Sequence, residues 1–340
     1  MERRIRKIYK QSEHEIAKNW NSFMEIQGLR VKSLQDEYYR LKNAGRTDEA
    51  KTVAIELSKR KKEMTLGNEH FKRMAEHTAN ELSRTNAIAL AYVNGQIPEI
   101  YRINYNAVAG TIKEFGGMSF QLINQDTLKY MITKNPTLIP QKTLNRHKDI
   151  RWNMKRINSS VLQGIIQGES MDEIAERLLP IMNNNAASAI RNARTLVTSA
   201  ENKGKLDSFE QLEADGAVLK KVWIATGDDR TRDWHLDMDG QEVDIDEDFV
   251  DGLGNEIAYP GDPKGEPETI YNCRCAMRAN IIGFRKADGR VEKITREERN
   301  GTHQFEIKEE RMRRRYGECS NHKPEERLVE RSTGSGCKTN

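Results

Sequence analysis

The sequence predicts an α+β fold in which a long α-helical amino-terminal half is followed by a small α+β domain. Apolar side chains recur at steps of three, four and seven residues through the first 93 positions, which is a helical period. After residue 216 the pattern changes to short segments rich in β-branched and aromatic residues between turn formers. Charged residues make up 32% of the 340 and the mean hydropathy is -0.82, so apolar material for one large core is scarce.

Residues 1–93 are predicted to form a helical hairpin or bundle arm. The break Asn43-Ala44-Gly45 separates two amphipathic runs. The apolar positions of the two runs are Ile5, Ile8, Tyr9, Ile16, Trp20, Phe23, Ile26, Leu34, Tyr38 and Leu41, then Val53, Leu57, Met64, Phe71 and Met74. We interpret the aromatic ones as packing residues. Because so polar a chain has little apolar surface to cover such long stripes, we expect a partner to complete part of them.

Residues 94–150 are predicted to connect the arm to the second domain. Gly95 and Pro98 indicate a short linker, and Tyr101, Ile103 and Tyr105 indicate a strand or a loop after it.

Helical signals return where the domain at 151–283 begins. An apolar stripe from Ile157 to Ile166 ends at Gly168, a natural helix stop. Ser170 and Glu173 have the spacing of a capping box, which predicts a second helix from Met171 to Leu179.

A third helix is predicted from Ala186 to about Lys203. The two preceding helices superficially resemble the start of a DNA-reading helix-turn-helix. Pro180 and Asn183-Asn184-Asn185 fall where the short turn into a recognition helix should lie, which favours ordinary helix packing.

Two strands frame the rest of this domain. Ala217–Ala225 is β-branched and aromatic, and Ala276–Ile282 alternates apolar and polar residues. Between them, Pro260, Pro263 and Pro267 predict an irregular loop, the kind of segment that often carries a site.

Charge is distributed unevenly along the chain. The net charge is +4, yet residues 226–268 carry 15 Asp or Glu against 3 Lys or Arg, a local charge of -12 that leaves +16 for the rest. Such a balance allows contact with nucleic acid or with an acidic protein surface, or is simply solvated. Residues 284–340 are predicted to be a charged, partly disordered extension. Its basic run Arg311–Arg315 either meets DNA phosphates or forms one exposed helical turn.

No targeting signal is expected in this sequence. The amino terminus lacks the apolar core of a signal peptide, and the longest apolar stretch, residues 87–93, is too short to span a bilayer. Four cysteines are too few for a disulfide scaffold. We therefore expect a protein made in a reducing cytoplasm, with no membrane partner, in which Cys273 and Cys275 are thiols.

The segment from Trp223 to Cys275 gathers the chemically versatile side chains. An ordered set of motif residues runs through it and the preceding helix: Arg194, Thr195, Trp223, Asp229, Arg230, Arg232, His235, Asp239, Gly240, Gln241, Pro260, Gly261, Asn272, Cys273, Arg274 and Cys275. This order resembles the phage Mu F-like minor head protein family, also called the phage head morphogenesis family. The resemblance covers roughly residues 150–283. The Asp-Gly-Gln motif alone is common in proteins, whereas the ordered set of motif residues is specific.

The resemblance implies a function in the assembly of a phage or prophage head. It implies a minor capsid protein that associates with the portal, contacts capsid or scaffold proteins and can travel inside the virion with the packaged DNA. It further implies a location at the capsid interior or portal vertex and, during assembly, the bacterial host cytoplasm. No catalytic residue, small-molecule substrate or organic cofactor is expected.

His235, Cys273 and Cys275 are also a partial zinc set, since imidazole and thiolate are ligands that zinc prefers. A fourth ligand could be Asp237 or Asp239, or, less readily, His303 or Cys319. Because Cys-x-Cys is narrower than the usual Cys-x2-Cys, the two thiols reach one ion only if the backbone bends. Without metal, the cysteines would act as small buried hydrophobes.

Two other chemistries use overlapping residues. Asp237, Asp239 and Gly240 match part of a calcium loop ending at Asp246, but His235 replaces the first carboxylate. A metal-dependent or thiol enzyme built on His235, Cys273 and Cys275 is the alternative to a structural protein, since a cysteine and a histidine distant in sequence can form a nucleophilic pair.

Overall fold

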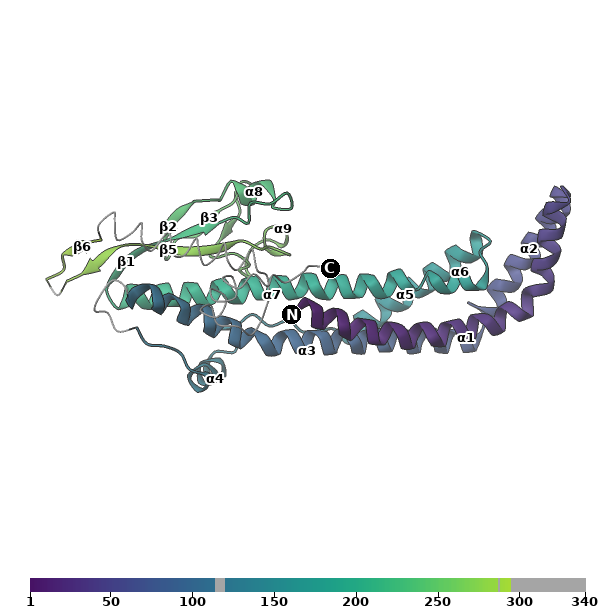
Figure 1. Ribbon diagram of the computed structural model, residues 1–340, viewed down its shortest axis with the longest axis horizontal. Coiled ribbons are helices and arrows are strands. Elements are labelled where there is room, and N and C mark those ends of the chain that lie inside the picture. Colours follow the sequence, from purple (N-terminus) through teal and green to yellow (C-terminus); the bar gives the residue numbers. More distant parts are fainter. Residues whose placement is uncertain (114–119, 287, 295–340) are drawn as a thin grey trace, which may run out of the picture.

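The computed structural model describes residues 1–113, 120–286 and 288–294. Long helices lie roughly side by side along one axis, and a small sheet covers one end of the helical body (Figure 1). The sheet lies on α7 (Leu179–Ala214), and α3 (Glu69–Lys113) packs along the same helix from the other side. This arrangement confirms the α+β class with a helical amino-terminal half.

The arm contains three helices where two were predicted. Helix α1 (Glu2–Asn43) ends at the expected break, where Gly45 has a φ of +71°. Four residues separate helix α2 (Thr47–Met64) from α3, a second break that the sequence did not reveal. Figure 1 shows α2 at the end of the molecule opposite the sheet.

The linker predicted at Gly95 and Pro98 is wrong, because α3 continues through both residues. Proline removes one hydrogen bond from a helix, but packing against α7 outweighs that loss. Tyr101 is fully buried, and its hydroxyl donates to Asp207 Oδ2 at 2.6 Å. Gly204 of α7 permits this contact, since a Cβ there would lie 2.5 Å from the Tyr101 carbonyl oxygen. The predicted boundary at residue 94 therefore lies inside a helix.

The predicted capping box is confirmed. Helices α5 and α6 meet at Gly168, whose φ is +74°, and Ser170 and Glu173 each bond the other's backbone N–H. The bounds here are α4 (Gln125–Lys134), α5 (Arg146–Ile166) and α6 (Met171–Glu176).

The predicted interruption at Pro180 and Asn183–Asn185 is wrong, because α7 begins at Leu179 and includes them. Pro180 occupies the first turn, where a missing N–H is tolerated. Asn185 is buried, and its side chain donates to the Ile181 carbonyl and to Asn153 Oδ1. The helix also continues eleven residues past the predicted end, to Ala214.

Both predicted strands are confirmed within an antiparallel sheet of order β2-β1-β5-β6. Its strands are β1 (Ala217–Ile224), β2 (Glu242–Asp244), β5 (Ala276–Arg285) and β6 (Val291–Lys293). A two-stranded sheet, β3 (Phe249–Val250) and β4 (Glu256–Ile257), and two short helices, α8 (Asp233–Leu236) and α9 (Pro267–Ile270), complete this part. We call residues 216–294 the lobe.

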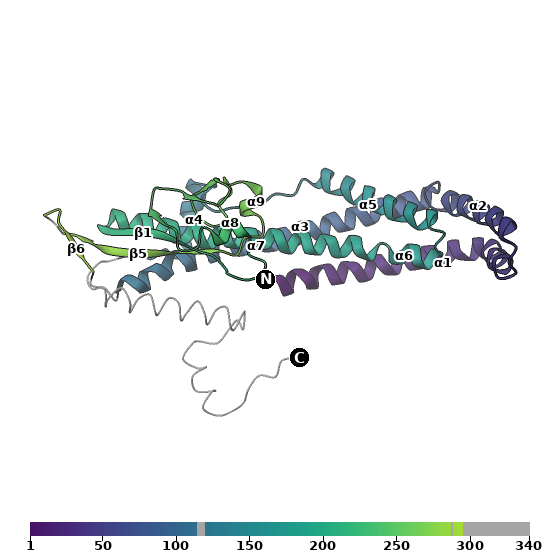
Figure 2. The same ribbon diagram turned by 90° about the horizontal axis from the view of Figure 1, so that it is seen from above.

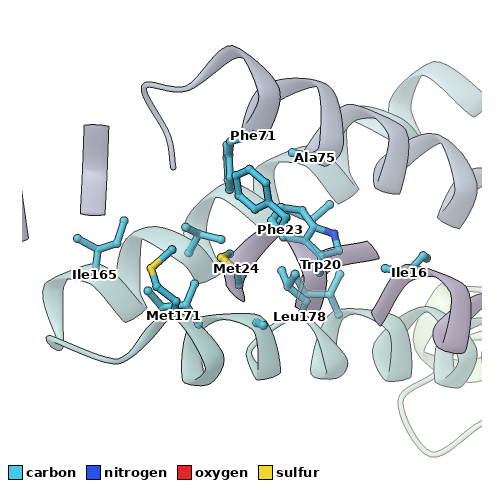
Figure 3. Packing of buried hydrophobic residues seen from close by; sticks show 14 of the residues in the cluster. Ile16, Trp20, Phe23, Met24, Phe71, Ala75, Ile165, Met171 and Leu178 are labelled. Carbon is cyan, nitrogen blue, oxygen red and sulfur yellow. The ribbon is translucent and has the colours of Figure 1, made fainter. Parts of the chain in front are cut away.

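The apolar stripes of the arm are largely covered by the chain itself, and only part of their apolar surface stays exposed, at residues such as Leu29 and Ile55. Trp20 and Phe71 meet edge to face inside a cluster that also contains Ile165, Met171 and Leu178 (Figure 3). The cluster thus joins residues of the first 93 positions to α5, α6 and α7. The Trp20 indole N–H donates to Thr78 Oγ1 at 2.8 Å, so its polar atom is satisfied.

Two further clusters form the middle of the helical body and the interior of the lobe. The N-terminus lies beside α7 in the middle of the molecule (Figures 1 and 2). No helix among the described residues is long and apolar enough to cross a membrane. The basic run Arg311–Arg315 and most of the charged extension lie outside the described ranges.

Candidate functional site

His235, Cys273 and Cys275 converge in the interior of the lobe. The imidazole Nδ1 lies 3.4 Å from Cys275 Sγ and 3.7 Å from Cys273 Sγ. All three residues are less than 5% exposed, and their potential ligand atoms lie within 4.8 Å of one another. The His235 ring packs edge to face against Trp223, and its Nε2 has no hydrogen-bond partner within the described residues.

The backbone bend that Cys-x-Cys requires is present. Asn272 has a φ of +57°, a left-handed conformation, directly before the first thiol. The Cys275 N–H then folds back to within 3.4 Å of Cys273 Sγ. Both sulfur atoms therefore face the same imidazole, although a flat strand would not hold them together.

The two thiols differ in acidity. The hydrogen bond with Cys273 lowers the pKa of Cys275 to about 5, opposed by burial and assisted by His235. The same bond, together with burial, raises the pKa of Cys273 well above its usual value. Of the two thiols, Cys275 is therefore the more acidic.

Helix α7 positions both cysteines through their backbone. Thr198 Oγ1 donates to the Cys273 carbonyl at 2.8 Å. The Asn202 amide donates to the carbonyls of Pro260 and Cys275 at 3.2 and 3.3 Å, and its Oδ1 accepts the Met277 N–H at 3.0 Å. Sequence reasoning missed both α7 residues, because a polar residue within a helix does not reveal that it faces a loop 70 residues away.

The motif arginines bind loops to one another. Arg274 makes a two-pronged salt bridge with Asp228, with N–O distances of 2.5 and 2.6 Å. This guanidinium, chiefly through its hydrogen bonds, holds the pKa of the Asp228 carboxyl well below its usual range. Asp229 and Arg230 beside it are exposed, and Arg232 donates to the Tyr271 carbonyl.

Arg194 and Thr195 secure the turn before Cys273. Arg194 donates to Asn272 Oδ1 at 3.1 Å and to Glu2 Oε1 at 2.8 Å, so it ties this turn to the start of α1. Thr195 Oγ1 accepts the Asn272 N–H at 2.9 Å. The left-handed residue is therefore held by two side chains of α7.

A second group of motif residues forms the turn after α8. Gly240 has a φ of +78°, and its N–H donates to the Trp223 carbonyl, while Trp223 N–H donates to the Gln241 carbonyl. Asp239 Oδ1 accepts the Ala225 N–H at 2.8 Å. The Gln241 side chain bonds both backbone groups of Val250. These residues serve to fold the lobe.

The Pro260-Gly261 turn lies directly on α7. Gly261 has a φ of +83°, and a Cβ there would lie 2.9 Å from the backbone nitrogen of Ser199. Nearby, the fully buried Lys221 donates to the Ala258 carbonyl at 2.8 Å, and burial lowers the pKa of its ammonium group. Sequence reasoning assigned no role to this lysine, since lysine in a strand normally faces solvent.

Two chemical readings of the segment are not supported by this geometry. In the part of the chain that the structure describes, Asp237, Asp239 and Asp246 do not gather into a group of close ligands, which argues against calcium. Cys273, Cys275 and His235 are almost fully buried, which argues against a thiol that reaches a substrate. A metal ion, in contrast, can bind while the lobe folds and then needs no access channel.

Comparison with known proteins agrees with the motif order. Residues 155–278, which include α7, β1 and the three converging side chains, match the family described as Phage Mu protein F like protein. This region is thus similar to the Mu F-like family. The match confirms the resemblance drawn from the motif residues.

Three relatives align with the chain. One is the minor head protein GP7 of Bacillus phage SPP1, 29% identical over 199 residues, which are 57% of this chain and 63% of that protein. Another is the NAD(+)–arginine ADP-ribosyltransferase EFV of Enterococcus faecalis, 27% identical over 49% of this chain but only 34% of that protein. The third is the uncharacterized protein YqbB of Bacillus subtilis, 27% identical over 41% of this chain and 49% of that protein.

The chain thus aligns with about one third to two thirds of the length of these relatives. No solved structure matches the chain significantly. The family match and the minor head protein among the relatives support the phage minor head protein family, and the role of this chain is a matter of proposal.

Proposed function

We propose that this protein is a minor head protein that docks on the portal during phage head assembly and is retained in the virion. The observation that carries this proposal is the Mu F-like match across residues 155–278, together with the relative named as a minor head protein. The motif residues favour a non-catalytic role, because most of them bond backbone groups or each other inside the lobe. The protein would form in the host cytoplasm and end at the portal vertex or capsid interior.

The surface proposed to meet the portal is the end of the helical body that carries α2. Apolar side chains remain exposed there after the arm core has formed: Leu29 of α1 (69% exposed), Ile55 of α2 (71%) and Ile166 at the end of α5 (73%). Ile26 lies one helical turn before Leu29 and is also exposed. We take these exposed apolar side chains as the proposed contact surface, since protein interaction sites often expose apolar side chains.

The acidic part of the lobe is proposed to accelerate this association. Asp244, Asp246, Glu247 and Asp248 are exposed around β2, so their charge acts through solvent. Such charges increase the association rate more than the final affinity, and salt screens them. Escort of packaged DNA remains a proposal from the family resemblance.

Docking is tested with surface variants of the whole chain. A fragment starting near residue 95 would cut α3 and remove half of the arm core, so its failure to bind would be uninformative. Leu29→Glu, Ile55→Glu and Ile166→Glu should each weaken capture by isolated portal rings. Ile103→Glu is the matched control, since Ile103 is a half-exposed isoleucine of α3 outside the proposed surface.

Virion content decides between a structural and a free catalytic protein. Mass spectrometry of purified particles should find the protein at a few copies per portal. Absence from both virions and portal complexes would refute the assembly role and favour an effector. Neutralising the four acidic residues should slow association at low salt and have little effect at high salt; an equal loss at both would refute steering.

A further inference from the structure

The most unusual chemical feature of the lobe is a buried imidazole that faces two thiols at once. A neutral imidazole nitrogen has a single proton or a single lone pair, so Nδ1 of His235 can make one good hydrogen bond. It nevertheless lies 3.4 and 3.7 Å from two sulfur atoms, which are weak hydrogen-bonding groups. Hydrogen bonding alone gives little reason for this three-way convergence in a buried position.

The separations agree with those between ligands of a tetrahedral zinc ion. Bonds of about 2.3 Å to sulfur and about 2.0 Å to nitrogen place the two ligand atoms about 3.5 Å apart at the tetrahedral angle. The two observed nitrogen-to-sulfur distances lie on either side of this value. All three ligand atoms lie within 4.8 Å of one another.

The ligands come from two separate segments, and the segment with the cysteines is held by α7. Cys273 and Cys275 are fixed by Thr198 and Asn202 of α7, and His235 lies on α8, 38 residues earlier than the first cysteine. Rigid support of this kind is what a metal site needs from the residues around its ligands. It also means that an ion here would join α8 to the sheet and to α7.

We propose that His235, Cys273 and Cys275 bind one structural zinc ion that fastens the lobe. The soft nitrogen and sulfur set favours zinc over magnesium or calcium, which prefer oxygen ligands. The three protein ligands leave one coordination position for water or a further side chain. The role is structural, because the ligands are buried and, within the part of the chain that the structure describes, few backbone hydrogen bonds join α8 to the rest of the lobe.

The test measures metal in the full-length protein. Protein expressed in zinc-supplemented medium and purified without chelator should contain about one zinc per chain, measured by inductively coupled plasma mass spectrometry. Cys273→Ser, Cys275→Ser and His235→Ala should each lose most of this zinc. Cys337→Ser, which removes a cysteine outside the proposed site, should retain it.

Loss of folding must be separated from loss of a ligand. Met277→Ala creates a cavity in the same lobe without removing a ligand, since Met277 is 1% exposed, and should be destabilised while keeping its zinc. The unaltered protein provides a readout that needs no variant: Co²⁺ in place of zinc should give the intense absorption of thiolate-bound tetrahedral cobalt. A chelator should lower the melting temperature of the unaltered zinc-containing protein, and added zinc should restore it.

Zinc-free protein that neither zinc nor cobalt stabilises would overturn the proposal. Full zinc content in both cysteine variants would overturn it equally. Both results are independent of whether the protein is found in virions.

Discussion

Replacing Asn202 by alanine tests whether one buried amide holds the Mu F-like domain together. Asn202 is 1% exposed on α7, and its amide bonds the Pro260 and Cys275 carbonyls while its Oδ1 accepts the Met277 N–H. Its place between the helix, the Pro260 turn and the start of β5 makes it the common contact of three segments.

The expected loss follows from the groups that alanine would leave without partners. The Met277 N–H loses its acceptor in the buried lobe, and two carbonyls lose a donor. A buried group without a partner costs about 1–3 kcal/mol, and carbonyls, which have two lone pairs, fall toward the lower end. Since relaxation and entry of water recover part of this, we expect Asn202→Ala to lower the free energy of unfolding by about 2–4 kcal/mol.

Urea unfolding measures this loss, with Asn184→Ala as the matched control. Asn184 is exposed on the same helix, and alanine there should change stability by a few tenths of a kcal/mol at most, in the stabilising direction. If the free energies of unfolding of the two variants differ by less than about 0.5 kcal/mol, water replaces the Asn202 amide without a loss of stability, and the reasoning is refuted.

Three further outcomes are expected. In calorimetry, Gly261→Ala should destabilise the folded protein by about 1–3 kcal/mol more than Gly254→Ala. Both glycines have positive φ, but only a Cβ at Gly261 would lie 2.9 Å from the Ser199 backbone nitrogen. Equal losses of stability would mean that the Gly261 turn shifts freely. Ser170→Ala should cost about 1 kcal/mol by removing the cap of α6, and an unchanged urea midpoint would contradict that boundary. Burial, and after it the Asp207 carboxylate, raises the pKa of Tyr101 far above its usual value. At alkaline pH the folded chain therefore keeps the Tyr101 proton that the unfolded chain releases. Stability should therefore decline as the pH rises above about 10, and Tyr101→Phe should flatten that decline; an unaltered slope would show that other groups cause it.

The sequence by itself determined the features that depend on a few adjacent residues. Gly45 and Gly168 end helices because glycine readily adopts a left-handed backbone, and Ser170 with Glu173 caps the next helix through bonds that span four residues. The strands on either side of the Trp223–Cys275 segment were predictable from their β-branched content. The order of the motif residues was also sufficient to identify the Mu F-like family.

Tertiary structure decided what depends on distant contacts. Pro98 lies within a helix because Tyr101 packs against Gly204, more than 100 residues later, and such packing exceeds the local preference for a break. The spacing of Cys273 and Cys275 argued against a shared ligand site until Asn272, held by two side chains of α7, turned the backbone and brought both sulfurs to His235. Local signals describe the conformations that a segment favours in isolation, whereas the fold selects the one whose buried contacts and hydrogen bonds are satisfied by residues far away in the chain.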